Sequence, residues 1–83
     1  MKVLYFAWLR QRVGVAEETL EVPPAVDTVA KLIDWLKERD EAYRNAFADL
    51  RIVRAAVNQS LVPLDTPLAG AREVAFFPPV TGG

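Results

Sequence analysis

One segment of this 83-residue chain has the complete pattern of an amphipathic helix, and this limits the folds that the chain can adopt. Asp27 and Thr28 are both residue types that cap helices. After them, apolar residues recur at the i, i+3, i+4, i+7 spacing of a helix with one buried face. These residues are Val29, Leu32, Ile33 and Leu36. A helix of this kind must bury its apolar face against another layer, so the rest of the chain has to supply that layer.

The segments around this helix have strand patterns. Strands are predicted for residues 2–8, 17–22, 52–57, 61–62 and 73–77, and a second, shorter helix is marked by Tyr43, Phe47 and Leu50. A helical turn that ends at Gly14 is predicted between the first two strands. This order of elements is similar to that of ubiquitin-like domains, and by analogy with known folds we predict an α+β fold of the ubiquitin-like β-grasp type. Its mixed sheet of about five strands would have the first and last strands adjacent at its centre, and one main helix and one short helix on one face.

Length and composition indicate a single folded domain. Hydrophobic residues make up 52% of the chain and charged residues 25%, which is typical of a globular protein. The net charge of −1 does not favour a nucleic acid or an anionic membrane as partner. Residues 1–2 lead directly into strand-like sequence, and no apolar run is long enough to cross a membrane. We expect a cytoplasmic protein.

The chain contains neither cysteine nor histidine, which excludes several kinds of chemistry. Disulfides, thiol nucleophiles and the usual zinc sites all need one of these residues. Histidine is also the only side chain that titrates near neutral pH without being perturbed. No pair of carboxylates suggests acid–base catalysis. We therefore expect no bound cofactor or metal, and no catalysis by the side chains of this chain alone.

The first and last predicted strands are apolar on both faces. If one helix layer covers the sheet, the residues on the other side should be exposed to solvent. The outward positions would be Leu4, Phe6, Trp8, Ala75 and Phe77, with Leu61 nearby. An antiparallel sheet with one wet face normally alternates apolar and polar residues. Because large exposed apolar patches mark partner sites, we predict a protein interface at Phe6, Leu61 and Phe77. The alternative is that the short helix or a loop covers these residues.

The C-terminus is the second unusual feature. Residues 1–77 are predicted to form the domain, and residues 78–83 a flexible tail with the sequence Pro78, Pro79, Val80, Thr81, Gly82, Gly83. Six extended residues reach about 20 Å. Glycine has no Cβ, so the end can pass through a narrow channel and lie close to another backbone. We predict that the tail, from Pro78 to Gly82, inserts into a partner and presents the carboxylate of Gly83 as a reactive group.

Three stretches of the chain resemble the MoaD family, the small sulfur-carrying subunits of molybdopterin synthase. These stretches are residues 3–7 with Arg10, residues 55–59, and residues 73–83. The last stretch, Glu-Val-Ala-Phe-Phe-Pro-Pro-Val-Thr-Gly-Gly, is the most specific. The resemblance covers essentially the whole chain in length and in the order of its elements.

The resemblance implies a role for the terminal carboxylate. A MoeB-like activating enzyme would use ATP to adenylate Gly83, and a sulfur donor would then convert the adenylate into a thiocarboxylate. A MoaE-like large subunit would receive the tail and transfer the sulfur to cyclic pyranopterin monophosphate in molybdenum cofactor biosynthesis. The small subunits of the family sit at the two ends of a dimer of large subunits, so a heterotetramer is expected.

Other interpretations of the sequence remain open. The Gly-Gly end is shared with the sulfur carrier of the thiamine pathway and with ubiquitin-like protein modifiers. The chain could also be an interaction module in which Gly82 and Gly83 have no chemical role. The carrier interpretations require a change at the terminal carboxylate, whereas the interaction module does not.

Overall fold

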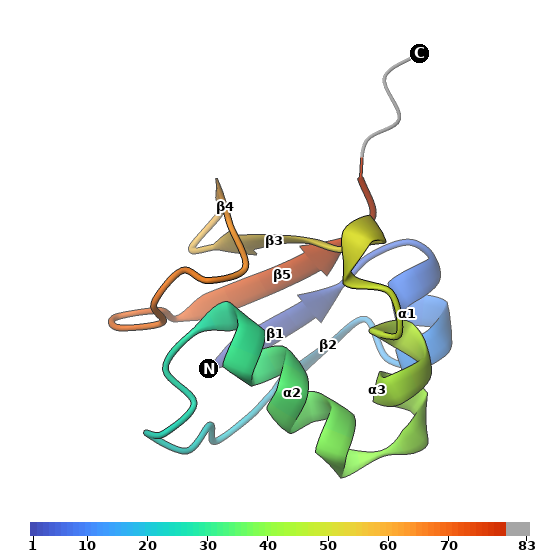
Figure 1. Ribbon diagram of the computed structural model, residues 1–83, viewed down its shortest axis with the longest axis horizontal. Helices are drawn as coiled ribbons and strands as arrows, with labels where there is room; N and C mark the ends of the chain where they lie inside the picture. The colour runs from blue at the N-terminus through green and yellow to red at the C-terminus, as the bar shows by residue number, and fades with distance from the viewer. Residues whose placement is uncertain (80–83) are drawn as a thin grey trace.

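The computed structural model describes residues 1–79, which form a five-stranded sheet with helices packed on one face (Figure 1). The strands are β1 (Lys2–Tyr5), β2 (Glu17–Thr19), β3 (Arg54–Val57), β4 (Ser60–Val62) and β5 (Glu73–Phe77). They lie in the order β2-β1-β5-β3-β4. The central pair β1 and β5 is parallel, and the other neighbouring pairs are antiparallel. The predicted α+β, ubiquitin-like β-grasp fold is confirmed.

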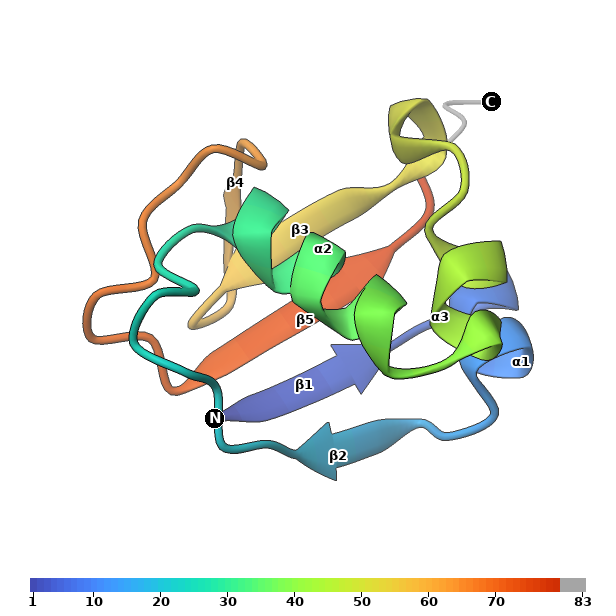
Figure 2. The same ribbon diagram turned by 60° about the horizontal axis from the view of Figure 1, so that its bottom comes forward.

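Two helices cover one face of the sheet (Figure 2). They are α2 (Val29–Arg39) and α3 (Glu41–Ala46). Thr28 caps α2, and its Oγ1 accepts a hydrogen bond from the Lys31 backbone N–H at 3.2 Å. Asp40 caps α3 in the same way, through the Ala42 N–H at 3.0 Å. Both caps satisfy backbone donors that a helix start leaves without partners, which explains why the helices begin where they do.

A third helix, α1 (Trp8–Val13), follows β1 directly. It ends at Gly14, which has a left-handed φ of 97°. The Gly14 N–H donates to the Arg10 carbonyl at 2.8 Å. The predicted helical turn that ends at Gly14 is therefore present. The prediction that the first strand continues to Trp8 was wrong. Ala7 has a φ of 56°, which turns the chain out of the sheet and into α1. The helix then packs against α3 instead of extending β1 (Figure 2).

Two other strands are shorter than predicted. The strand predicted for residues 17–22 ends at Thr19, and the strand predicted for 52–57 begins at Arg54. Before β3, the chain forms a 3-10 turn, η1 (Leu50–Ile52), in which Asp49 accepts the Arg51 backbone N–H at 3.0 Å. This capped turn replaces the first residues of the predicted strand, because Asp49 offers the backbone a local hydrogen-bond partner.

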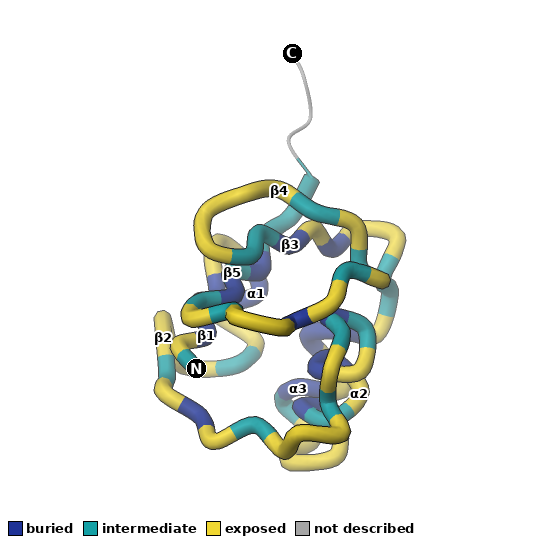
Figure 3. Tube along the Cα trace, turned by 90° about the vertical axis from the view of Figure 1, so that its left-hand side faces the viewer, coloured by how far each residue is buried: buried dark blue, intermediate teal, exposed yellow. Residues whose placement is uncertain are grey.

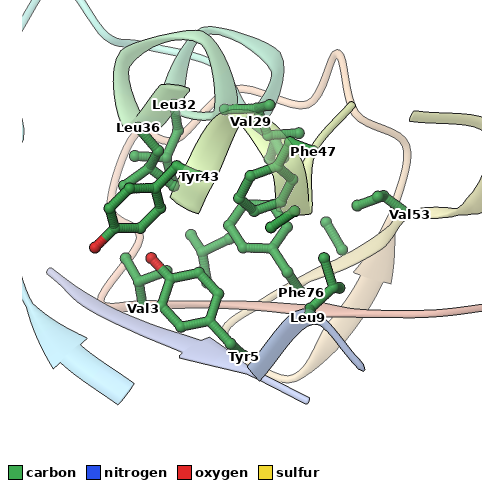
Figure 4. Close-up of a cluster of buried hydrophobic side chains, with 14 of the residues drawn as sticks. Val3, Tyr5, Leu9, Val29, Leu32, Leu36, Tyr43, Phe47, Val53 and Phe76 are labelled. Carbon is green, nitrogen blue, oxygen red and sulfur yellow. The ribbon is translucent and has the colours of Figure 1, made fainter. Parts of the chain in front are cut away.

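The core lies between the sheet and α2 and α3 (Figure 4). Alternate residues of the two central strands point into it, and all are buried: Val3, Tyr5, Val74 and Phe76. The Phe47 and Phe76 rings meet edge to face, with centroids 5.0 Å apart. Burying each large side chain contributes about 1.5–3 kcal/mol, so this alternation fixes which face of the sheet receives the helices.

One carboxylate links the edge strand β2 to the centre of the domain. The Glu18 Oε2 atom accepts hydrogen bonds from the Tyr5 hydroxyl at 2.7 Å and from the Tyr43 hydroxyl at 2.6 Å. The Arg39 Nη1 atom lies 3.6 Å from Glu18 Oε1. Burial, and then the hydrogen bond to Glu18, raise the pKa of both tyrosines, in the case of Tyr43 to about 12. The two hydroxyls must therefore stay protonated for this junction to persist.

This junction predicts a specific loss of stability at alkaline pH. A folded-state pKa above the usual value of 10.0 means that Tyr43 stabilises the fold below pH 10 and that this contribution is lost as the pH rises through about 12. Tyr43→Phe should lower the free energy of unfolding at pH 7 by about 1–2 kcal/mol, because it removes a hydrogen bond to a charged group. It should also reduce the decline in the free energy of unfolding between pH 10 and about 12. Urea unfolding across this range measures both effects, and parallel pH profiles for the two proteins would contradict the assignment.

Candidate functional site

The outer face of the sheet carries a row of apolar side chains that crosses four strands. Strand register places Leu4 beside Ala75, Ala75 beside Ala56, and Ala56 beside Leu61. These residues alternate with the buried ones, so they lie on the face opposite α2 and α3. In the part of the chain that the structure describes, those two helices do not cover this row (Figure 2). The expected apolar outer surface is present.

A second row lies where β5 ends. The Phe6 N–H donates to the Phe76 carbonyl at 3.0 Å, which extends the β1–β5 pairing by one residue and brings Phe6 beside Phe77. On its other side Phe77 pairs with Arg54 of β3. Phe6 is 47% exposed, whereas Phe77 is half-buried. The exposed Phe6 and Arg54 therefore lie on either side of Phe77, the last residue of β5, after which the chain leaves the sheet.

Leu61 lies at the far edge of this face. It is 70% exposed on β4, an edge strand that is exposed along most of its length (Figure 3). Three strand spacings, roughly 14 Å, separate β4 from β1. The structure therefore brings Phe6 and Phe77 together and leaves Leu61 apart from them, with Ala56 and Ala75 between. The predicted interface residues share one face, but they form a broad surface rather than a compact cluster.

Polar residues border the apolar surface at the other end of the strands. The Lys2 ammonium and the Glu17 carboxylate form an ion pair at 3.1 Å, and Glu73 lies beside Lys2 in the strand register. An apolar centre with a polar rim is the usual anatomy of a protein–protein interface. The apolar part of the outer face is therefore directed towards the end at which β5 finishes.

Two residues near this end were not predicted as site residues. Ile52, at the end of η1, is 42% exposed, and Arg54 is exposed two residues later. The sequence did contain a signal for Arg54, because the apolar residues Val53 and Ala55 lie on either side of it. The structure buries both of these neighbours. Residues that alternate with a buried set point to the opposite face of a strand.

The predicted tail begins immediately after Phe77. Pro78 and Pro79 are half-buried and continue the chain beyond β5. Val80, Thr81, Gly82 and Gly83 lie outside the described residues, so their proposed roles remain predictions. The division into a domain of residues 1–77 and a tail of residues 78–83 also remains a prediction.

Two surface depressions lie away from the end of β5. One, of about 360 Å³, is lined by Lys2, Asn58, Gln59, Arg72 and Glu73. The other, of about 540 Å³, is mainly apolar and includes Met1, Val22 and Leu68 in its lining. Lys2 and Glu73 begin the two central strands, so the first depression is at the opposite end of the sheet from Phe77. Met1, in the lining of the second depression, immediately precedes β1, so that depression also adjoins the end of the sheet opposite Phe77.

Within residues 1–79 there is no cluster of three or more acidic, histidine or cysteine side chains that could hold a metal ion. None of the helices in this part of the chain is both long enough and apolar enough to span a membrane.

Comparison with known families and sequences gives matches along the whole chain. The model of the ThiS family matches residues 3–83. A protein named molybdopterin synthase sulfur carrier subunit from Escherichia coli is 43% identical over 83 residues, which are 100% of this chain and 99% of that protein. A protein of the same name from Mycobacterium tuberculosis is 37% identical over 84 residues, with 100% of this chain and 96% of that protein covered.

Solved structures show the same architecture. A protein from Pyrococcus furiosus that is described as molybdopterin converting factor, subunit 1, superposes on this chain with a TM-score of 0.70 at 36% identity. The match covers 95% of each chain. Small archaeal modifier protein 1 from Haloferax volcanii gives a TM-score of 0.64 at 25% identity, over 96% of this chain and 97% of that one. The similarity therefore extends through the sheet, the helices and most of each chain.

The two faces of the sheet should respond differently to the loss of a phenyl ring. Phe76 is fully buried, so Phe76→Ala should cost about 3–5 kcal/mol of the free energy of unfolding. Phe6 is half exposed, so Phe6→Ala should cost less than about 1 kcal/mol. Chemical denaturation of the isolated variants provides the measurement. Equal losses would mean that Phe6 belongs to the core and that the outer face is not free for a partner.

Proposed function

The chain belongs to the ThiS family and, within it, to the molybdopterin synthase sulfur carrier subunits, and from this membership we propose that the carboxylate of Gly83 carries the sulfur as a thiocarboxylate. The observation that carries the proposal is the absence of cysteine from a sulfur carrier. Without a thiol, no side chain of this protein can hold sulfur in a transferable form. The C-terminal carboxylate is a group that can be activated to do so, and the family match extends to Gly83.

Loading needs activation, because an ionised carboxylate is a poor electrophile. A C-terminal carboxyl group has a pKa of about 3.3–3.7 and is anionic at neutral pH. We propose that an adenylating enzyme joins this carboxylate to the α-phosphate of ATP and releases pyrophosphate. Sulfide then attacks the acyl carbon, the new carbon–sulfur bond replaces the bond to AMP, and AMP leaves. ATP is thus a substrate of the activating enzyme, and we propose that this step takes place in the cytoplasm.

Transfer uses the thiocarboxylate sulfur as a nucleophile. We propose that the tail enters the large subunit of the synthase, where the sulfur forms a bond to a carbon of cyclic pyranopterin monophosphate. The bond from that carbon to its oxygen substituent breaks, and the oxygen is the leaving group. Water then cleaves the bond between the sulfur and the acyl carbon, which regenerates the Gly83 carboxylate. A dithiolene product needs two sulfur atoms and each carrier brings one. A heterotetramer with two carriers on a dimer of large subunits is the assembly that we propose.

The outer face of the sheet is the proposed docking surface for the large subunit. Phe6 and Phe77 lie side by side where β5 ends, and Leu61 extends the surface to the β4 edge. A partner that covers Phe77 is positioned to receive Pro78 and Pro79, which follow it directly. Pro-Pro favours an extended polyproline conformation and reduces the entropy that the tail loses on insertion.

Two other roles are supported by the comparisons. The ThiS family model leaves open a carrier that serves the thiamine pathway. The likeness to small archaeal modifier protein 1 leaves open attachment of Gly83 to lysines of other proteins. Complementation of strains that lack one pathway distinguishes the two carriers. A modifier would yield isopeptide adducts in which Gly83 is joined to a lysine Nε atom.

The proposal depends on the position of the last residue. Deletion of Gly83, or addition of one residue after it, should abolish synthase activity because the reactive carbon no longer reaches its place in the partner. The free energy of unfolding should remain unchanged, because the buried core that the structure describes is built from residues between Val3 and Phe76. Activity is assayed with the large subunit, the activating enzyme, ATP and a sulfide donor. Full activity of either variant would refute a terminal thiocarboxylate.

The docking surface predicts a loss of binding without a loss of folding. Leu61→Ala and Phe77→Ala should each weaken association with the large subunit by about 30-fold, since interface anchors contribute roughly 2 kcal/mol or more. Phe77→Ala should also slow sulfur transfer, because Phe77 precedes the tail. Calorimetric titration measures the affinity, and Val15→Ala is a control at another exposed apolar residue outside the strands. Wild-type affinity of both variants would place the interface elsewhere.

A further inference from the structure

We propose that Arg54 determines partner specificity by pairing with a carboxylate of the large subunit beside the start of the tail. This inference rests on the proposed function, because it assigns a residue to the same docking surface. It adds an electrostatic contact to the apolar part of that surface.

Arg54 lies next to Phe77, the residue that immediately precedes the predicted tail. It is the first residue of β3 and pairs in register with Phe77, the last residue of β5. Directly opposed residues of antiparallel strands have Cβ atoms about 4.5–5.5 Å apart. Arg54 Nη1 donates to the carbonyl oxygens of Arg51 and Val53, both at 3.1 Å. These bonds hold the guanidinium against its own backbone, at the end of the sheet where β5 finishes.

The charge of Arg54 has no acidic partner among residues 1–79. The neighbouring Arg51 is different, because its guanidinium binds both carboxylate oxygens of Asp49, at 2.9 and 3.0 Å. A guanidinium has five N–H donors, and the two bonds of Arg54 to carbonyl oxygens both use Nη1. The remaining donors of Arg54 are therefore available for a planar, bidentate contact with a carboxylate from outside.

Docking of a partner on Phe77 would also remove water from Arg54. A partner that receives Pro78 has to cover Phe77, and Arg54 is the direct neighbour of Phe77 in the sheet. Burial of a charge without a counter-charge is unfavourable. An apolar partner surface would therefore be rejected here, whereas a surface with an aspartate or glutamate at this point would be accepted. Such a charge requirement gives specificity that apolar contacts alone do not provide.

The occupant that fits best is the large subunit of the synthase. The relatives of this chain are named as subunits of that enzyme, so the lasting complex is the one with the other subunit. The activating enzyme must also receive the tail, but only for the time of loading.

The test compares charge reversals on the two sides of the molecule. Arg54→Glu and Arg44→Glu change the net charge equally. Arg44 is exposed on α3, in the helix layer, and its Nη1 also donates to a backbone carbonyl, that of Lys37 at 3.2 Å. Arg54→Lys keeps the charge and serves as the conservative variant. Each full-length protein is titrated with the purified large subunit in about 50 mM and about 500 mM NaCl, and thermal unfolding of each variant is recorded.

We expect Arg54→Glu to weaken binding about 10- to 100-fold in low salt, with a smaller difference in high salt. Arg44→Glu should bind like the wild type, and Arg54→Lys should retain most of the affinity. An Asp→Lys or Glu→Lys change in the large subunit should restore binding to Arg54→Glu, which would identify the paired carboxylate.

Equal binding of Arg54→Glu and the wild type would overturn the inference and leave the proposed function intact. Equal losses for Arg54→Glu and Arg44→Glu would overturn it as well, because the effect would be one of overall charge. Slower loading by the activating enzyme with normal binding to the large subunit would reject the choice of partner. Failure of the wild type itself to bind the large subunit would refute the proposed function together with the inference.

Discussion

The parallel pairing of β1 with β5 determines the position of nearly every other feature. It joins the first and last strands at the centre of the sheet, where Tyr5 lies beside Phe76. Because successive side chains alternate, the same pairing sends Tyr5 and Phe76 into the core and places Phe6 beside Phe77 on the outer face. The core and the proposed docking surface are thus two sides of one strand pair. Pro78 and Pro79 follow directly from β5, which is one of the two strands of this pair.

This arrangement explains why so small a domain can leave apolar residues exposed. A chain of this length buries a modest core, and here the core is completed on one face by α2, α3 and the Glu18 junction. The outer face is not needed for that core, so Phe6 and Leu61 can remain exposed without loss of the fold. A partner that covers this face would gain the hydrophobic free energy that folding has left unused.

The parts of the fold that were predictable from sequence are those with a strong local signal. α2 combines a capping Thr28 with a helical period, and β5 matches the predicted residues 73–77. β1 was predicted too long because a strand that is apolar on both faces has no alternation to mark its end, and the φ of Ala7 that ends it has no signature in the residue type. The Glu18 junction was not predictable either, because it joins residues from β1, β2 and α3 that only the tertiary fold brings together.

For the site, the exposure of Phe6 and Leu61 followed from counting strand positions, whereas Arg54 was not predicted as a site residue. Its neighbour Phe77 is 23 residues away in the chain, and strand register alone places the two side by side. The reactive end itself rests on sequence and family membership, since Gly83 lies outside the described residues.

The central claim is that sulfur travels on the terminal carbonyl of this protein. The most direct measurement is mass spectrometry of the carrier after incubation with the activating enzyme, ATP and a sulfide donor, first intact and then fragmented. The account predicts replacement of one oxygen by one sulfur, located in the fragment that contains Gly83. An unchanged mass in a sample that supports synthase activity, or sulfur in any other fragment, would contradict it.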